Sequence, residues 1–147
     1  MASYVFARIC DERHRTREDA LADVVQLVRD EYYYTRNEAP PKIMRRTPMI
    51  GIGGYGGRGL FILGHCAGLD WEQLPDGYRP YLHRIDVIWD GAVYGGDYDR
   101  VMEGVTKFNE RSWTSATQGD FALVQSRVLE GDVVARVKDD PVLPWAR

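Results

Sequence analysis

The sequence has few cysteines and no long apolar run. Its 147 residues contain two cysteines, Cys10 and Cys66, too few for the disulfide framework of a small secreted domain. No apolar run approaches the roughly 20 residues of a membrane-spanning helix. Arg8, Asp11 and Glu12 interrupt the N-terminal region before any stretch typical of a signal peptide. These absences predict reduced cysteines, no membrane insertion and no secretion by a signal peptide.

Neither sign of charge dominates. The chain has 19 Lys and Arg residues and 22 Asp and Glu residues, for a net charge of -3 at pH 7. A chain of this balance has no overall field that attracts nucleic acid, which is therefore not an expected partner. The hydrophobic share of 44% and the charged share of 28% are close to those of globular proteins. This length and composition predict one folded domain, residues 1–147.

The first half of the chain predicts a strand, a helix and a hairpin. Residues 4–9 are rich in β-branched and aromatic side chains, which favours a strand. Thr16 can cap a helix from Arg17 to Tyr34, in which apolar residues recur at helical spacing. The apolar runs 49–53 and 60–63 are joined by a cluster of glycines, and this pattern predicts two strands of a hairpin.

The middle of the chain predicts a loop, a strand and a second helix. Prolines and an Asp-Gly pair between Asp70 and Tyr81 are typical of a loop. Residues 82–89 alternate between apolar and polar side chains, which predicts a half-buried strand that ends in a turn at Asp90-Gly91. Asp97 can cap a helix with one apolar face, extending to Arg111.

The C-terminal region allows two interpretations. Residues 121–129 and 133–137 predict two strands around Glu130-Gly131-Asp132, although Phe121, Val124 and Val128 also fit one face of a helix. The hairpin is the favoured interpretation. The predicted fold is therefore α+β, with two helices packed on one face of a mainly antiparallel sheet.

The glycine-rich segment resembles a dinucleotide-binding string. Residues 51–56 spell GIGGYG, and Asp70 lies near the distance of a ribose-binding acid. A dinucleotide site requires a helix directly after the glycines, whereas the run 60–63 is typical of a strand. A hairpin without a cofactor is therefore expected. An anion held by backbone amides of this loop and Arg58 remains an alternative.

Residues 64–68, Gly-His-Cys-Ala-Gly, resemble the nucleophile elbow of the α/β-hydrolases with cysteine in place of serine. Cys66 would then be the nucleophile, with His83 as base and Asp86 or Asp90 as the residue that orients it. The alternative interpretation is a small buried thiol at the end of a strand. A metal site is not expected, because His14, His65 and His83 show no zinc-binding spacing.

The order of the predicted elements resembles a bacteriophage family. A helix over residues 16–34, a strand over 48–53, the strand His-Arg-Ile-Asp-Val-Ile-Trp at 83–89 and a helix over 97–111 follow one another. This order, in which such a strand precedes a helix and a closing pair of strands, is similar to that of the tail-terminator or tail-completion proteins of long-tailed bacteriophages, over residues 16–138. The resemblance implies a ring-forming protein without chemistry that caps a tail tube and joins it to the connector. It implies a location in the virion or the cytoplasm.

No complete catalytic constellation is evident, and the leading hypothesis is a non-enzymatic protein that binds copies of itself and other proteins of an assembly. Exposed aromatic residues and pairable strand edges favour such contacts. The residues expected to make them are Tyr33, Tyr55, Arg58, Arg84, Asp86 and Trp145. Two alternatives remain: a small cysteine-dependent hydrolase or transferase, and an inhibitor that binds a host complex through Arg45, Arg46 and the tyrosines.

Overall fold

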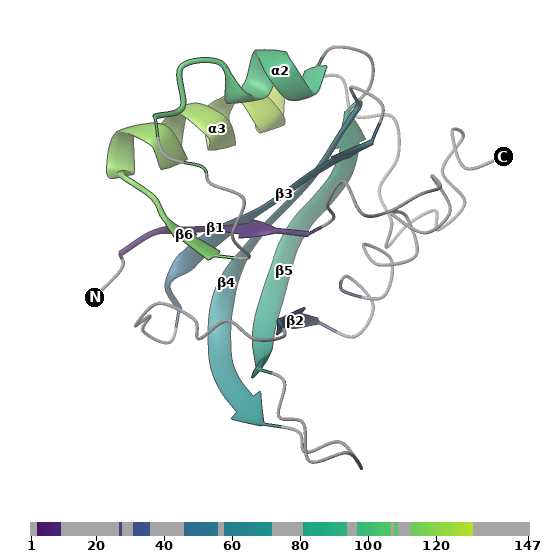
Figure 1. Ribbon diagram of the computed structural model, residues 1–147, viewed down its shortest axis with the longest axis vertical. Coiled ribbons are helices and arrows are strands. Elements are labelled where there is room, and N and C mark those ends of the chain that lie inside the picture. Colours follow the sequence, from purple (N-terminus) through teal and green to yellow (C-terminus); the bar gives the residue numbers. More distant parts are fainter. Residues whose placement is uncertain are drawn as a thin grey trace, which may run out of the picture.

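A computed structural model describes residues 3–9, 27, 31–35, 46–55, 58–71, 81–93, 97–106, 108 and 113–130. Figure 1 shows its strands and helices in their spatial arrangement. In chain order they are β1 (Val5–Arg8), β2 (Tyr32–Thr35), β3 (Pro48–Tyr55), β4 (Arg58–Trp71), β5 (Tyr81–Val93), α2 (Asp97–Met102), β6 (Trp113–Ser115) and α3 (Gln118–Glu130).

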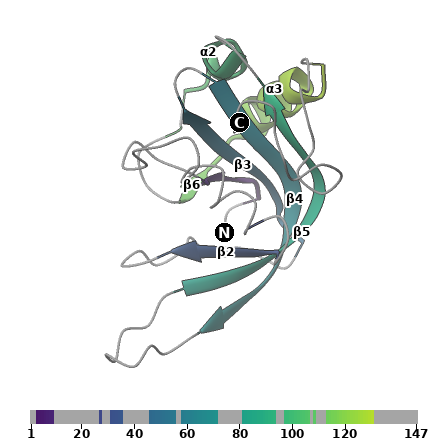
Figure 2. The ribbon, with the colours of Figure 1, turned by 90° about the vertical axis from the view of Figure 1, so that its right-hand side faces the viewer.

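The strands form one six-stranded sheet in the order β2-β5-β4-β3-β1-β6. β1 runs parallel to β3, and the other neighbouring pairs are antiparallel. The two helices α2 and α3 lie together against one end of this sheet, as Figures 1 and 2 show from two directions. The predicted α+β class, with two helices on a mainly antiparallel sheet, is confirmed.

The glycine-rich hairpin is also confirmed. β3 and β4 pair from Pro48 opposite His65 to Tyr55 opposite Arg58, so only two residues join the strands. Two-residue connections suit glycine because their backbone angles exclude most side chains. The hairpin is longer than predicted, because β4 continues to Trp71.

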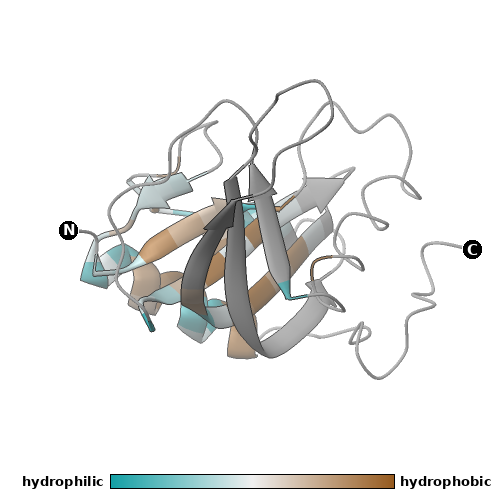
Figure 3. Cartoon of the chain, turned by 90° about the horizontal axis from the view of Figure 1, so that it is seen from below, coloured by the Kyte–Doolittle hydropathy of each residue, from teal (hydrophilic) through white to brown (hydrophobic). Residues whose placement is uncertain are grey.

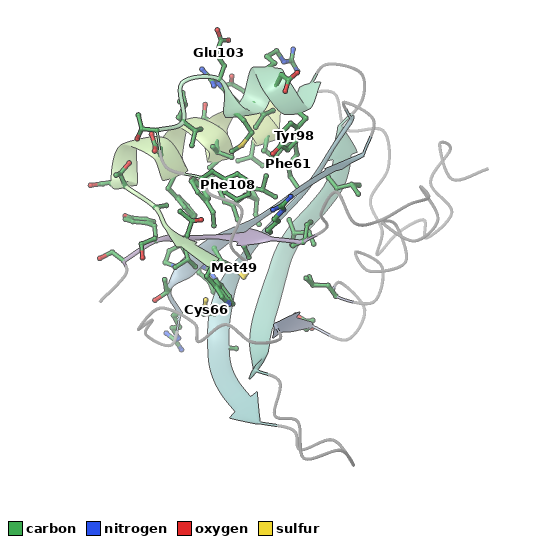
Figure 4. The ribbon with its side chains drawn as sticks, viewed as in Figure 1. Met49, Phe61, Cys66, Tyr98, Glu103 and Phe108 are labelled. Atoms are coloured by element: carbon green, nitrogen blue, oxygen red, sulfur yellow. The ribbon has the colours of Figure 1, made fainter. Side chains whose placement is uncertain are left out.

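The main core lies between the helices and the sheet. Aromatic rings fill much of it: Phe6 lies 6.1 Å from both Phe108 and Phe121, and Phe61 stacks on Tyr98 at 6.4 Å between ring centroids. Figure 4 shows Phe61, Tyr98 and Phe108 in the space between the helices and the strands. The buried members of the core are Phe6, Ile50, Ile52, Phe61, Leu63, Val101, Phe121, Val124 and Val128. Burial of this apolar surface is the main driving force for packing the two layers.

The strands are buried on their other face as well. Val5, Met49, Leu60 and Ile62 alternate with the core residues along their strands, and each is fully buried. Figure 3 shows the hydrophobic colouring of the described central strands. Since both faces of β1, β3 and β4 are apolar there, these strands lie inside the protein.

β4 and β5 bend away from the helices. They are 14 and 13 residues long, and their pairing shifts register between Leu63 and Gly64 and again between Cys66 and Gly68. Such bulges bend a strand and increase its twist. Figure 2 shows the result, because the lower ends of β4 and β5, together with β2, project away from α2 and α3.

A cap at its N-terminus begins α3. The backbone N–H of Asp120 donates to Thr117 Oγ1 at 3.0 Å, and the N–H of Phe121 donates to the Thr117 carbonyl at 2.9 Å. A threonine with an acidic residue three positions later is typical of a helix start. The Asp120 carboxylate also accepts hydrogen bonds from Thr106 Oγ1 at 2.9 Å and from the Thr106 N–H at 3.1 Å. The start of α3 is thereby fixed to the segment after α2.

The other end of α3 is fixed to α2 by one arginine. Arg127 Nη1 donates to the Val101 carbonyl at 3.1 Å and also to the Glu103 carbonyl. The last carbonyls of a helix lack partners within the helix, and a cation near them is favourable. The two helices therefore form one layer.

The predicted C-terminal hairpin is wrong, because residues 118–130 form helix α3. The alternative helical face was the correct one: Phe121, Val124 and Val128 are buried against the core. The Gly131-Asp132 pair had suggested a turn, but the cap at Thr117 and this apolar face favour a helix. Residues 133–137, the second predicted strand, lie outside the described residues.

The predicted helix from Asp97 to Arg111 ends at Met102. Gly104 adopts a left-handed conformation with φ 80°, and the Val105 N–H donates to the Met102 carbonyl at 3.1 Å. Glycine at this position ends many helices. Val105 and Phe108 still pack against the core from the segment after the helix.

The predicted helix from Arg17 to Tyr34 is wrong at its C-terminal end. Residue 27 is helical, but Glu31 has φ 56° and its N–H donates to the Leu27 carbonyl at 2.8 Å. A left-handed residue ends a helix, and Tyr32–Thr35 form strand β2 instead. Apart from Leu27, the part of this helix before Glu31 lies outside the described residues.

The predicted strands at 4–9 and 82–89 are confirmed as β1 and β5. The predicted loop from Asp70 to Tyr81 is wrong at its ends, because Asp70 belongs to β4 and Tyr81 to β5, and residues 72–80 lie outside the described residues. The predicted turn at Asp90-Gly91 is wrong. Asp90 and Gly91 continue β5, where they pair with Ile62 and Phe61. Pairing with the long strand β4 overrides the local turn preference of Asp-Gly.

Candidate functional site

The segment around Cys66 is a strand, so the predicted nucleophile elbow is wrong. Residues 64–68 lie within β4, whereas an elbow requires a sharp turn between a strand and a helix. The Cys66 N–H donates to the Thr47 carbonyl at 2.8 Å, and the Arg46 N–H donates to the Cys66 carbonyl at 2.6 Å. Arg46 has φ 72°. Arg46 and Thr47 therefore lie together opposite Cys66. This arrangement of two residues against one, with the first left-handed, is a β-bulge, and it pairs both the N–H and the C=O of Cys66.

The Cys66 thiol is chemically protected. The residue is 2% exposed, and Figure 4 shows its side chain near Met49, away from the two helices. Burial raises the pKa of the thiol from 9.0 to about 12, because the apolar surroundings disfavour the thiolate. A catalytic cysteine requires the opposite change. The alternative interpretation of Cys66 as a small buried thiol fits its surroundings, although it lies within the strand rather than at its end.

The proposed base and orienting residue do not face Cys66 in the sheet register. Cys66 pairs with Ile85, whereas His83 pairs with Leu69 and Asp86 pairs with His65. The register therefore gives no cross-strand pair of nucleophile and base.

We expect native Cys66 to react with iodoacetamide at pH 8 far more slowly than free cysteine, because its raised pKa keeps it protonated.

The raised pKa of Cys66 also makes the stability of the protein depend on pH. The unfolded thiol ionises from about pH 9 and the buried one only near pH 12, so the free energy of unfolding falls across this window. Urea titrations at several pH values test this, with Cys66→Ala as the control that removes the decline. A native thiol faster than free cysteine would restore the catalytic hypothesis.

The glycine string does not form a dinucleotide site. Residues 51–55 lie in β3, and β4 rather than a helix follows the turn. No helix N-terminus is therefore available to a pyrophosphate at this point. The anion alternative at Arg58 stays a prediction.

The predicted interaction residues fall along β5 and its neighbours. Tyr33 pairs with His83, next to the pair of Tyr32 and Arg84, so Tyr33 and Arg84 lie together where β2 meets β5. Asp86 is two positions farther along β5.

The other predicted interaction residues lie toward the far end of β5. Tyr55 and Arg58 form the last pair of the β3–β4 hairpin. The next residue, Gly59, pairs with Val93, the last residue of β5. The predicted interaction residues therefore flank β5 at both ends. Trp145 lies outside the described residues.

In the described part of the chain, the outer edge of β5 is open beyond its pairing with β2. β2 pairs with only the first four of its thirteen residues. From Ile85 to Val93, nine residues, no strand in the described part of the chain pairs with the side of β5 away from β4. An open edge offers a row of backbone N–H and C=O groups to another strand.

Within the described ranges no three His, Cys, Asp or Glu residues are grouped so that they could hold a metal ion. No helix there has the length and apolar character needed to cross a membrane. The chain matches no protein-family model, and no curated protein or solved structure is significantly similar to it.

Proposed function

We propose that this protein is a non-enzymatic assembly component that associates with copies of itself and with other proteins through the outer edge of β5. The observation that carries the proposal is the position of Tyr33, Arg84 and Asp86. These three predicted interaction residues come together where the pairing of β2 with β5 ends and the open edge begins.

The edge suits a strand as its partner. Main-chain hydrogen bonds to an added strand give affinity without a preformed pocket. The part of β5 beyond its pairing with β2 contains Ile85, Val87, Ile88 and Trp89, residue types that favour strands. The protected thiol of Cys66, the most specific catalytic candidate in the sequence, supports the non-enzymatic side of the proposal.

The resemblance to phage tail-terminator proteins extends this proposal to a particular assembly. In that case the oligomer would be a ring at the end of a tail tube, with the connector as its second partner. Its support is the part of the predicted order that stands, the strands at 48–55 and 81–93 and a helix that begins at Asp97, whereas residues 118–130 form a helix in place of a closing strand. A ring requires head-to-tail contacts between copies.

We expect Arg84→Glu to weaken self-association by about tenfold, equivalent to about 1.4 kcal/mol. Arg84 lies where the pairing with β2 ends, and an acidic residue there joins Asp86 and Asp90 on the same strand. The added negative charge repels the same acidic strand of an approaching copy. Sedimentation velocity over a concentration series measures the change.

Arg100→Glu is the matched control, because Arg100 is exposed on α2 and its replacement by glutamate changes the net charge by the same amount. It should leave association unchanged. Circular dichroism and thermal melting should show both variants folded. Equal association of wild type, Arg84→Glu and Arg100→Glu would contradict a role for this edge.

A further inference from the structure

We infer that the strand added to the open edge of β5 is β5 of a second copy, paired antiparallel across a two-fold axis near Trp89. This inference rests on the proposed function and specifies its first partner and geometry. A two-fold axis brings the same surface of both copies together, so each residue of the edge meets its counterpart in reverse order.

The lengths of the available edges favour pairing of β5 with itself. In the described part of the chain the sheet ends at β2 and β5 on one side and at β6 on the other. β6 has three residues, whereas the open run of β5 has nine. A head-to-tail contact between β5 and β6 forms at most a three-residue ladder. Self-pairing of β5 uses the whole run, and stability of a sheet increases with the number of cross-strand pairs.

The two aspartates of the run select the position of the axis. With Trp89 at the axis, Asp86 and Asp90 each face apolar or glycine residues of the other copy. An axis at Ile88 places Asp86 opposite Asp90, and an axis at Asp90 places that residue opposite itself. Like charges directly opposite one another destabilise a sheet. The register around Trp89 is thus free of acidic pairs and is also centred on the run.

The composition of the run is compatible with pairing. Edge strands that stay unpaired commonly carry lysine or proline, and the segment 85–93 has neither. Its charged residues are Asp86 and Asp90 alone. Like-charge pairs disfavour axes at Asp86, Ile88 and Asp90, and of the remaining positions only an axis at Trp89 pairs all nine residues of the run with one another.

Oxidative cross-linking tests the axis. A cysteine on a two-fold axis lies opposite its own counterpart, so Trp89→Cys in a Cys10→Ser background should give a disulfide-linked dimer with copper phenanthroline. Cys66 is buried and stays unreactive. Ser126→Cys, exposed on α3, is the matched control and should remain monomeric on a non-reducing gel. Both variants are first checked by circular dichroism, since Trp89 pairs with the buried Leu63.

A second measurement uses the wild-type chain. In a mixture of ¹⁵N,²H-labelled and unlabelled protein, amide protons of residues 87–90 should show intermolecular NOEs to Hα protons of the same segment. Antiparallel strands bring these protons close together.

The outcomes separate the inference from the proposed function. Cross-linking at Trp89 with NOEs within 87–90 supports both. An oligomer, including a closed ring, that shows neither signal overturns the two-fold pairing and leaves the proposed assembly function standing. A protein that stays monomeric at all concentrations overturns both, and Asp86, Asp90 and the register shift then act to keep the edge unpaired.

Discussion

Replacing Phe6 by alanine should lower the free energy of unfolding by about 3–5 kcal/mol, as for other large buried aromatic residues. Phe6 is fully buried. Its ring stacks nearly parallel to that of Phe121, at 6.1 Å and 8°, and meets Phe108 edge-on. It therefore joins β1 to α3 and to the segment after α2, and its loss leaves a cavity where these parts meet.

Urea denaturation of wild type and Phe6→Ala measures this change. Leu129→Ala is the control, because Leu129 is 55% exposed on α3 and its truncation should change stability by no more than about 0.5 kcal/mol. A loss below about 1 kcal/mol for Phe6→Ala, well short of the range for a buried phenylalanine, would show that the two layers do not pack as described.

Gly51→Ala should destabilise the protein by about 1–3 kcal/mol through overpacking. A Cβ atom at Gly51 would lie 2.8 Å from Ile9 Cγ2 and 3.3 Å from Ile62 Cβ. Neither atom is the free end of a flexible chain. The N–H of Ile9 is held by the Ile52 carbonyl at 3.1 Å, so the backbone must move to accommodate the methyl group.

Gly119→Ala provides the opposite expectation. Gly119 lies in the first turn of α3, and nothing is within 4 Å of the position of its Cβ. Alanine in a helix is more stable than glycine by about 0.5–1 kcal/mol, so this variant should be stabilised. Equal effects of the two substitutions in thermal and urea unfolding would contradict the close packing at Gly51.

The hairpin and β5 could be predicted from the sequence because their signals are local. Apolar runs on both sides of the glycines specify β3 and β4, and alternation from residue 82 to 89 specifies the start of β5. The extension of β4 and β5 could not be predicted. It depends on their pairing with one another, which holds Asp70, Asp90 and Gly91 in strands despite their preference for turns.

The helices show why local patterns were insufficient. α3 contains valines and precedes the turn residues Gly131-Asp132, and both features favoured two strands. The cap formed by Thr117 and Asp120 instead starts a helix. The end of the first helix at Glu31 left no comparable sequence signal, because glutamate rarely adopts the left-handed conformation. The parallel pairing of β1 with β3 joins residues about forty positions apart, beyond the reach of periodicity.

The candidate site was predictable only in part. The sequence offered Cys66 as a candidate nucleophile, but the chemistry of its thiol depends on burial within β4, which raises the pKa. Tyr33, Arg84 and Asp86 were chosen for their residue types, and the pairing of β2 with β5 brings them to one place. Among the described residues, the edge beyond them is open because β2 pairs with only the first four residues of β5, and no motif in the sequence encodes the length of β2.

Native mass spectrometry of the freshly purified protein tests most directly whether it is a non-enzymatic assembly component. The monomer has a mass of 16.8 kDa, and we expect a defined multiple of this mass without a bound small molecule. The oligomeric fraction should be smaller for Arg84→Glu than for Arg100→Glu. A monomer that carries a cofactor, a metal ion or a covalent adduct on Cys66 would contradict it.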